Sequence, residues 1–133
     1  MAKPFFLSGS TSDDFEQTVE RRNLLPPCPD SPNCIRISRV FQHAKTKVYN
    51  TAKTVIKNMG AHDAELLEEP LRINAVFKAF IYKDDFIVLI EDEEANDSSC
   101  CVHIRSSSRV GYSDLGVNRR RVKRFLRKLG GRL

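Results

Sequence analysis

The chain has 133 residues, 41% of them hydrophobic, and a formal net charge of +5. This length and composition predict one domain with an ordinary hydrophobic core. No run of about 18 apolar residues occurs, so no membrane-spanning helix is predicted. The apolar part of Met1–Leu7 is too brief for a secretory signal, and we therefore predict a cytoplasmic location.

The charge is unevenly distributed along the chain. Residues 105–133 contain ten Lys or Arg and one acid, Asp114, whereas residues 1–104 contain more acids than bases. A basic C-terminal region attracts anionic partners such as a small ligand, nucleic acid or anionic lipid. It can equally lie beside acidic runs of its own chain, such as Glu91–Glu94.

Residues 1–24 are predicted to form an N-terminal tail that precedes a single α+β domain over residues 25–133. Within the tail, Ser12–Arg22 has the pattern of a short helix, with acids in its first turn and Arg in its last. Pro26 and Pro27 follow, and proline cannot continue a helix.

The segment CPDSPNC, Cys28–Cys34, consists almost entirely of turn-forming residues. We predict a structural or redox loop in which the relevant residues are Cys28, Asp30, Ser31, Asn33 and Cys34. Because the cytoplasm keeps thiols reduced, free cysteines are the main expectation, with a Cys28–Cys34 disulfide under oxidising conditions as the alternative. A zinc site made by Cys28, Cys34, Cys101 and His103 is sterically feasible, but the CxxC spacing is absent, and we predict no metal or cofactor.

The next two elements are a strand and a helix. Ile35–Phe41 alternates apolar and polar residues and is predicted as an edge strand. His43–Met59 places its apolar residues on one continuous helical face, and Gly60 follows as a stop. This pattern predicts a helix that packs on the core.

A series of strands is expected after this helix. Ala64–Glu69 is predicted as a short strand. Arg72–Tyr82 has a clean period of two, with one face made by Ile73, Ala75, Phe77, Ala79 and Ile81. Lys83–Asp85 is predicted as a tight turn that leads into Phe86–Ile90. This last strand is apolar on both faces, which is typical of a central strand.

Two further elements complete the sheet. Glu91–Ser99 is predicted as an acidic loop, followed by a strand over Cys100–Ser106. Alternation along that strand places Cys101 and His103 on one face and Cys100 on the other.

The last helix is predicted over Val117–Leu129, with its end at Gly130-Gly131. The order strand, helix, four strands, helix predicts an α+β fold. We expect an antiparallel sheet of four to five strands, a long helix after the first strand and a C-terminal helix, with the helices on one face. By analogy of element order alone, this arrangement is similar to a helix-grip fold.

The segment Arg105–Arg121, RSSSRVGYSDLGVNRRR, concentrates hydroxyl groups, arginines and two glycines between a strand and a helix start. Exposed N–H groups at a helix N-terminus, with arginines beside them, form a natural site for anions. The alternative is a capped loop whose polar groups satisfy one another. The predicted ligand-binding residues are Arg105, Ser106, Ser108, Arg109, Tyr112, Asp114, Asn118 and Arg119.

Together with CPDSPNC and the pair Asp84-Asp85, this segment closely resembles a widespread family of uncharacterised proteins, catalogued as domain of unknown function 1499. The resemblance covers roughly Leu25–Leu129. It implies no particular activity. Alanine is usual in that family where this chain has Ser107, and many of its members carry an N-terminal membrane or export segment.

Three functions are compatible with these residues. We favour a non-catalytic domain that binds a small anionic or polar ligand where Cys28–Cys34 meets Ser106–Arg119. The first alternative is binding of nucleic acid or an acidic partner through the basic last helix, although aromatic residues suited to base stacking are scarce there. The second is an enzyme of unassigned class that uses Asp84, Asp85, Asp114 or a serine. A purely structural role for both motifs is the remaining possibility.

Overall fold

The computed structural model describes residues 23–30, 32–79, 81–93, 96–111 and 116–133. The expected tail over residues 1–22, with its short helix, lies outside this range. The described elements follow in this order: β1 (Cys34–Phe41), α1 (Lys45–Asn58), β2 (Asp63–Glu68), β3 (Leu71–Ala79), β4 (Tyr82–Glu93), β5 (Asn96–Ser108) and α2 (Val117–Arg132).

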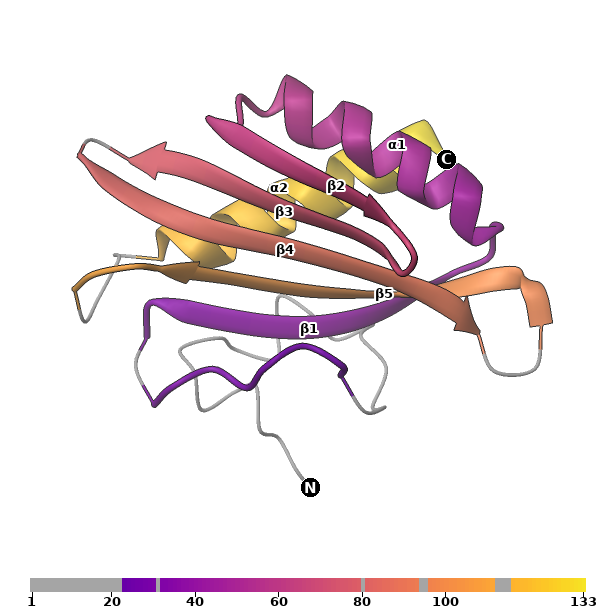
Figure 1. Ribbon diagram of the computed structural model, residues 1–133, viewed down its shortest axis with the longest axis horizontal. Coiled ribbons are helices and arrows are strands. Elements are labelled where there is room, and N and C mark those ends of the chain that lie inside the picture. Colours follow the sequence, from indigo (N-terminus) through magenta and orange to yellow (C-terminus); the bar gives the residue numbers. More distant parts are fainter. Residues whose placement is uncertain (1–22, 31, 80, 94–95, 112–115) are drawn as a thin grey trace.

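The five strands form one antiparallel sheet in the order β1-β5-β4-β3-β2. Strands β2 to β5 follow one another as a meander, and β1 joins the sheet beside β5 although α1 and three strands separate the two in sequence. Figure 1 shows both helices on one side of this sheet. The predicted α+β class, with an antiparallel sheet of five strands and two helices, is confirmed.

The core fills the layer between the sheet and the two helices. Alternate residues of the strands point into it, and they meet the apolar stripes that the sequence predicts on α1 and α2. Phe86 lies at its centre, with edge-to-face contacts to Phe77 and Phe125 at ring-centroid distances of 5.6 and 5.2 Å. Cys100 belongs to this core, which confirms the face predicted for it.

The opposite face of the sheet, here called the outer face, is partly covered by the segment before β1. This segment begins at Asn23 and runs alongside β1 (Figure 1). Leu25 is buried, and its carbonyl oxygen accepts a hydrogen bond of 2.9 Å from Arg36 Nη1. Asn23 Nδ2 donates to the carbonyl oxygen of Ile37 at 2.8 Å. Residues close to the predicted domain boundary are thus attached to the sheet.

Two predicted connections are strands instead. Lys83–Asp85, expected as a turn, belongs to β4 and pairs with β3. Glu91–Ser99, expected as a loop, is largely strand, because β4 continues to Glu93 and β5 begins at Asn96. Both predictions were based on the charge of the segment alone. They did not include the oppositely charged partners that other elements supply. One example is Lys45 of α1, whose Nζ lies 3.1 Å from Asp92 Oδ2.

The end predicted for the last helix is also wrong. Gly130 and Gly131 lie inside α2, which continues to Arg132. The buried side chain of Leu129 and the partly buried Leu133 both pack against the core. This burial outweighs the cost of about 1 kcal/mol that each glycine adds to a helix.

Candidate functional site

The register between β1 and β5 brings the two sequence motifs together at one end of the sheet. Cys34, the last residue of the CPDSPNC loop, lies directly opposite Ser107. Asn33 makes the closest connections. Its carbonyl oxygen accepts from the backbone N–H of Ser108 at 3.0 Å, and its side-chain amide donates to the carbonyl oxygen of Gly111 at 2.5 Å. The expectation that the two loops meet agrees with this geometry.

Asn118, at the start of α2, is the centre of the junction. Its side chain is almost fully buried, and its Oδ1 accepts a hydrogen bond from Ser106 Oγ at 2.5 Å. Its Nδ2 donates to the carbonyl oxygen of Asn33 at 3.2 Å and to Ser108 Oγ at 2.9 Å. One amide therefore joins α2, β5 and the loop before β1.

A buried ion pair extends this network below the helix. Arg121 Nη1 donates to Asp84 Oδ2 at 2.7 Å and to Asn118 Oδ1 at 3.2 Å. Only 8% of the Arg121 side chain and 3% of the Asp84 side chain are exposed. The guanidinium also lies over the ring of Phe77, with its carbon 4.8 Å from the ring centroid. The charge of Asp84 is thereby compensated inside the domain.

Asp84 and Asp85 point to opposite faces of β4, as adjacent residues of a strand must. Asp85 lies on the outer face, where Arg109 Nη2 and Nε donate to its carboxylate at 2.9 and 3.1 Å. The hydrogen bond with Asp85 raises the pKa of Arg109 above its ordinary value, with the attraction between the two charges as a second cause. Asp84 therefore stabilises the junction, and Asp85 holds Arg109 over the outer face.

The cysteines of the CPDSPNC loop form a disulfide between Cys28 and Cys34. The main expectation, two free thiols, is therefore wrong, and the alternative is what the structure has. The turn residues between the two cysteines allow the chain to reverse within a sequence separation of six. The four-ligand zinc site is wrong for the same reason, because two of its thiols are consumed by this bond.

Both glycines of the second motif have a left-handed backbone conformation. Gly111 and Gly116 have φ angles of 90° and 81°, in the left-handed region that only glycine adopts without strain. At Gly116 a β-carbon would in addition lie 2.9 Å from Arg120 Nη1. These two residues flank the part of the motif that lies outside the described residues, including Tyr112 and Asp114.

The predicted binding residues thus separate into groups. Ser106, Ser108, Asn118 and Asn33 are engaged in the junction. Asp30 is exposed, Arg119 is half-buried near the start of α2, and Ser31, like Tyr112 and Asp114, is outside the described residues. Among the described members of this list, Arg105 and Arg109 face the outer side of the sheet.

Those two arginines line a groove on the outer face with a volume of about 390 Å³. Its apolar lining comes from β3 and β4, and its polar lining includes three arginines and three acids. The lining residues are Asp63, Glu65, Arg72, Asn74, Ala75, Val76, Asp85, Ile87, Arg105 and Arg109. Sequence reasoning missed the contributions of β2, β3 and β4 to this groove, because the order of the strands was unknown.

Arg105 connects the groove to the segment before β1. Its Nε donates to the carbonyl oxygen of Pro26 at 2.9 Å, and its Nη1 donates to Ser107 Oγ at 3.1 Å. Burial lowers the pKa of Arg105, and the neighbouring Arg36 lowers it further. A negative charge brought into the groove beside Arg105 would relieve this repulsion.

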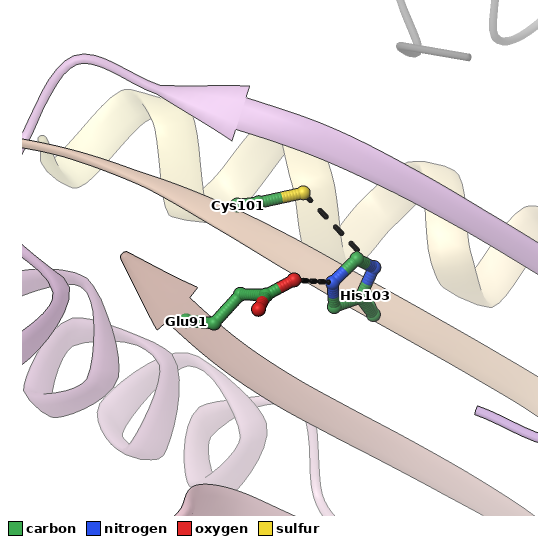
Figure 2. A group of neighbouring side chains, drawn as sticks. All are labelled: Glu91, Cys101 and His103. Atoms are coloured by element: carbon green, nitrogen blue, oxygen red, sulfur yellow. Dashed lines mark hydrogen bonds and ion pairs between the residues drawn. The ribbon is translucent and has the colours of Figure 1, made fainter. Parts of the chain in front are cut away.

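A second polar cluster lies on the outer face, closer to the start of β5. Figure 2 shows Glu91, Cys101 and His103 with their side chains directed toward one another. His103 Nε2 is 2.6 Å from Glu91 Oε2, and His103 Nδ1 is 4.0 Å from Cys101 Sγ. Cys101 and His103 share a face, as predicted, whereas the part played by Glu91 was missed because it was assigned to a loop.

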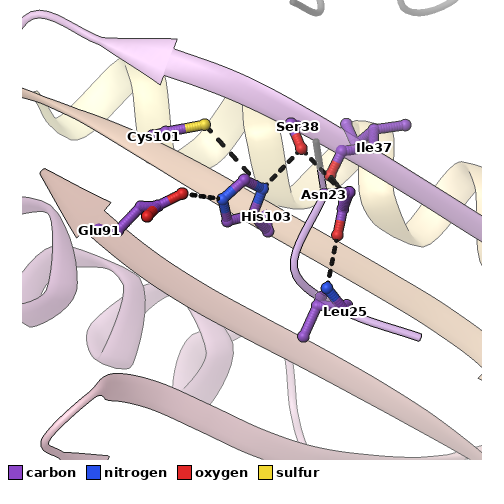
Figure 3. A network of polar contacts seen from close by, with 7 residues as sticks. All are labelled: Asn23, Leu25, Ile37, Ser38, Glu91, Cys101 and His103. Carbon is purple, nitrogen blue, oxygen red and sulfur yellow. Dashed lines mark hydrogen bonds and ion pairs between the residues drawn. The ribbon is translucent and has the colours of Figure 1, made fainter. Parts of the chain in front are cut away.

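The imidazole ring of His103 is held from both sides. Ser38 Oγ lies 2.6 Å from Nδ1, and Asn23 Nδ2 donates to Ser38 Oγ at 2.8 Å, so the chain of contacts reaches the segment before β1 (Figure 3). His103 and Cys101 are fully buried, and Glu91 is about one-third exposed. The cluster therefore has one side inside the protein and one side open to solvent through Glu91.

Among the described residues, no helix has both the length and the apolar character needed to cross a membrane. The fold is that of an α+β domain in which two helices cover one face of a five-stranded antiparallel sheet. Residues 24–129 match the family described as protein of unknown function (DUF1499), and the chain belongs to that family. No curated protein matches the chain.

Proposed function

We propose that this chain is a non-catalytic binding domain for a small polar ligand that carries an anionic group. The observation that carries the proposal is the groove on the outer face, about 390 Å³ in volume, with arginines of the second motif on its wall. Pockets for small ligands typically have volumes of about 300–1,000 Å³. The junction of the two motifs lies on the opposite face of the sheet and holds in place the end of β5 that carries these arginines.

The charges of the groove define the ligand more narrowly. Three arginines and three acids line it, so its formal charge is balanced, but the two signs are not mixed evenly. Asp63 and Glu65 belong to the edge strand β2, whereas Arg105 and Arg109 lie at the end of β5. A small zwitterion, with its anionic group toward the arginines and its cationic group toward β2, matches this arrangement best.

Arg72 lies between these two ends of the groove. Its Nε donates to Asn74 Oδ1 at 2.8 Å, and Asn74 Nδ2 in turn donates to Glu65 Oε1 at 3.1 Å. These hydrogen bonds hold the guanidinium on the outer face of β3. The planar guanidinium suits a carboxylate or phosphate group, which it can bind through two parallel hydrogen bonds.

An NMR titration of the isotopically labelled chain tests the proposal. Pools of small anionic and zwitterionic compounds should perturb the amide signals of Asn74, Ile87 and Arg105, which lie around the groove. Arg72→Gln and Arg109→Gln should each weaken binding about tenfold or more, because each removes a charged hydrogen bond worth about 1.5–3 kcal/mol. Arg127→Gln, an exposed arginine of α2, is the matched control and should bind as the parent does. Absence of any perturbation, or perturbations confined to α2, would refute the proposal.

Binding of nucleic acid through α2 is a second candidate, favoured by the exposure of Arg124, Arg127 and Lys128 on a helix that contains no acid. None of these three side chains has an ion-pair partner among the described residues. If they contact phosphates, the affinity for single- or double-stranded nucleic acid should fall steeply with salt. Replacing all three with Gln should reduce that salt dependence, and no binding at low salt would end this candidate.

The cytoplasmic location predicted from the sequence is opposed by one observation, because the Cys28–Cys34 disulfide is typical of oxidising compartments. We retain the cytoplasm as the proposal. Cell fractionation tests it, because the protein should be recovered with the cytoplasmic fraction, and recovery from an oxidising compartment would refute the proposal.

A further inference from the structure

We infer that Glu91, Cys101 and His103 form a binding site for a transition-metal dication, with Zn²⁺ as the ion that fits best. This site lies apart from the proposed ligand groove and does not depend on it. One ligand atom from each of the three residues lies within 4.8 Å of the other two. Figure 2 shows the three side chains converging from the neighbouring strands β4 and β5.

The pairing of the strands builds this triangle. Glu91 lies directly opposite Cys101 across β4 and β5. His103 is two residues further along β5 and therefore projects from the same face. Since side chains that are directly opposite have β-carbons about 4.5–5.5 Å apart, the pairing brings the three groups close together on one face. All three belong to regular strands, which makes the site rigid.

The chemistry of the three groups selects the metal. A thiolate and an imidazole bind Zn²⁺ and similar ions, whereas Mg²⁺ and Ca²⁺ prefer a shell of oxygen atoms. The Cys101 thiolate and the Glu91 carboxylate together carry two negative charges, which neutralise a dication in a site where Cys101 and His103 are fully buried. Three protein ligands with a fourth position left to water is the arrangement of zinc sites that can act on a substrate.

Binding requires the ligand atoms to move. Zinc bonds of about 2.0–2.3 Å place neighbouring ligand atoms roughly 3.5 Å apart around a tetrahedron. His103 Nε2 and Glu91 Oε2, now 2.6 Å apart, must separate, and Cys101 Sγ, now 4.0 Å from Nδ1 of the ring, must move toward the Nε2 side. The Glu91 side chain, about one-third exposed, can rotate to adjust and gives the ion an access route from solvent.

A second set of contacts orients the imidazole. Ser38 Oγ lies 2.6 Å from His103 Nδ1, and Asn23 Nδ2 holds that hydroxyl at 2.8 Å (Figure 3). Histidines that bind metals usually form a hydrogen bond through their other ring nitrogen, which fixes the ring. Because Ser38 occupies the Nδ1 side in the interior, we assign Nε2, on the side of Glu91, as the metal-binding nitrogen. Binding then displaces the proton between Nε2 and Glu91 and also the proton of the Cys101 thiol, and both leave to solvent.

Titration of the full chain with Zn²⁺, after removal of metals with a chelator, tests this site. The Cys28–Cys34 disulfide is kept intact, so that Cys100 and Cys101 are the free thiols. One Zn²⁺ should bind per chain in competition with a chromogenic chelator. Co²⁺ in place of Zn²⁺ should give the absorption band of a thiolate–cobalt bond, which Cys101→Ser should abolish.

Variants locate the ion. Loss of a group that hydrogen-bonds to a metal ligand typically weakens metal binding about 10–100-fold, and Ser38→Ala should fall within that range. Cys101→Ser and His103→Ala remove ligands themselves and should each weaken binding by more. Glu91→Gln leaves the fold least disturbed, because its side chain is partly exposed, and should also weaken binding by more than tenfold. Cys100→Ser, in the core on the opposite face, is the matched control and should bind as the parent does.

Failure to bind Zn²⁺ at micromolar concentration would overturn the inference. Binding that Glu91→Gln and Cys101→Ser both leave unchanged would do so as well, because it would place the ion elsewhere on the surface. A loss in Cys100→Ser equal to that in Cys101→Ser would also count against the site. Groove variants such as Arg72→Gln should leave Zn²⁺ affinity unaltered, which separates failure of this inference from failure of the proposed function.

Discussion

Replacing Asp84 with alanine is the sharpest test of the junction, because its neighbour Asp85 provides a control in the same strand. Asp84 is buried against Arg121 at 2.7 Å, with 3% and 8% of the two side chains exposed. The Asp84→Ala variant leaves the Arg121 guanidinium buried without its anion. Removal of one partner of a buried ion pair typically costs about 3–5 kcal/mol.

The control removes an ion pair of the same type from the surface. Asp85 and Arg109 are 39% and 46% exposed, so the Asp85→Ala variant should lose less than about 1 kcal/mol. The two variants change adjacent residues of β4 and remove the same chemical group. The difference between their losses of stability therefore measures how much burial adds to the importance of the ion pair.

Urea unfolding followed by far-ultraviolet circular dichroism provides the measurement, since the chain has no tryptophan. If the free energy of unfolding falls by about 2 kcal/mol per molar urea, the Asp84→Ala variant should unfold at a urea concentration about 2 M lower than the parent. The double variant Asp84→Leu/Arg121→Met should recover most of this loss, because it removes both charges. Equal losses for Asp84→Ala and Asp85→Ala would refute the assignment of Asp84 as a buried structural residue.

Three further predictions follow from the same structure. Asn118→Ala should lower the free energy of unfolding by about 3 kcal/mol in urea unfolding, because the Ser106 hydroxyl and the Asn33 carbonyl group would lose a buried partner; a loss below about 1 kcal/mol would contradict this. Reduction of the Cys28–Cys34 disulfide should cost about 2 kcal/mol in the same assay, as expected for a short loop, and an unchanged midpoint would show that the bond does not constrain the unfolded chain. Burial raises the pKa of the Cys100 thiol to about 12, with the neighbouring Cys101 and Asp92 as lesser causes. Since the thiol ionises near pH 9 in the unfolded chain, its contribution to stability should be complete below about pH 9 and be lost as the pH rises toward 12. In Cys100→Ser the fall in stability above pH 9 should be smaller.

Hydrophobic periodicity was sufficient to predict the fold class and most of the core. The alternation of Ile73, Ala75 and Phe77, and the apolar stripes of both helices, each predicted the face that is buried. The same alternation was wrong at Ile81, which lies beyond the end of β3 at Ala79 and is 83% exposed. These patterns are local, since a strand or a helix must place its own apolar residues on one side. The predicted fold needed little more than this.

The predictions failed where a residue depends on a distant partner. Asp84 was assigned to a turn because two adjacent acids with a lysine resemble one, yet it lies in a strand and is compensated by Arg121, 37 residues away. Glu91 was assigned to a loop for similar reasons, although it contacts His103 of the next strand. A single sequence contains no signal that connects such residues, because strand order and register are set by the packing of the whole domain.

The same argument applies to the candidate site. The two motifs meet because Cys34 lies opposite Ser107 in the pairing of β1 and β5. The same pairing places Ser38 opposite His103. Both consequences follow from one non-local register. The predicted list therefore contained polar residues of the two motifs, each of which is continuous in sequence. It omitted Ser38, Arg72 and Glu91, which join the sites only through the pairing of the strands.

The two faces of β5 divide structural from chemical roles. Ser106 points inward and is used by Asn118, so the hydroxyl groups of the second motif mainly hold α2 and the CPDSPNC loop to the sheet. Cys101, His103 and Arg105 alternate with the core residues and point outward, where a thiol, an imidazole and a guanidinium lie in one row. Changes on the inward face should therefore be visible first as lost stability. Changes on the outward face should affect binding of a ligand or metal while the domain stays folded, and functional experiments are best directed there.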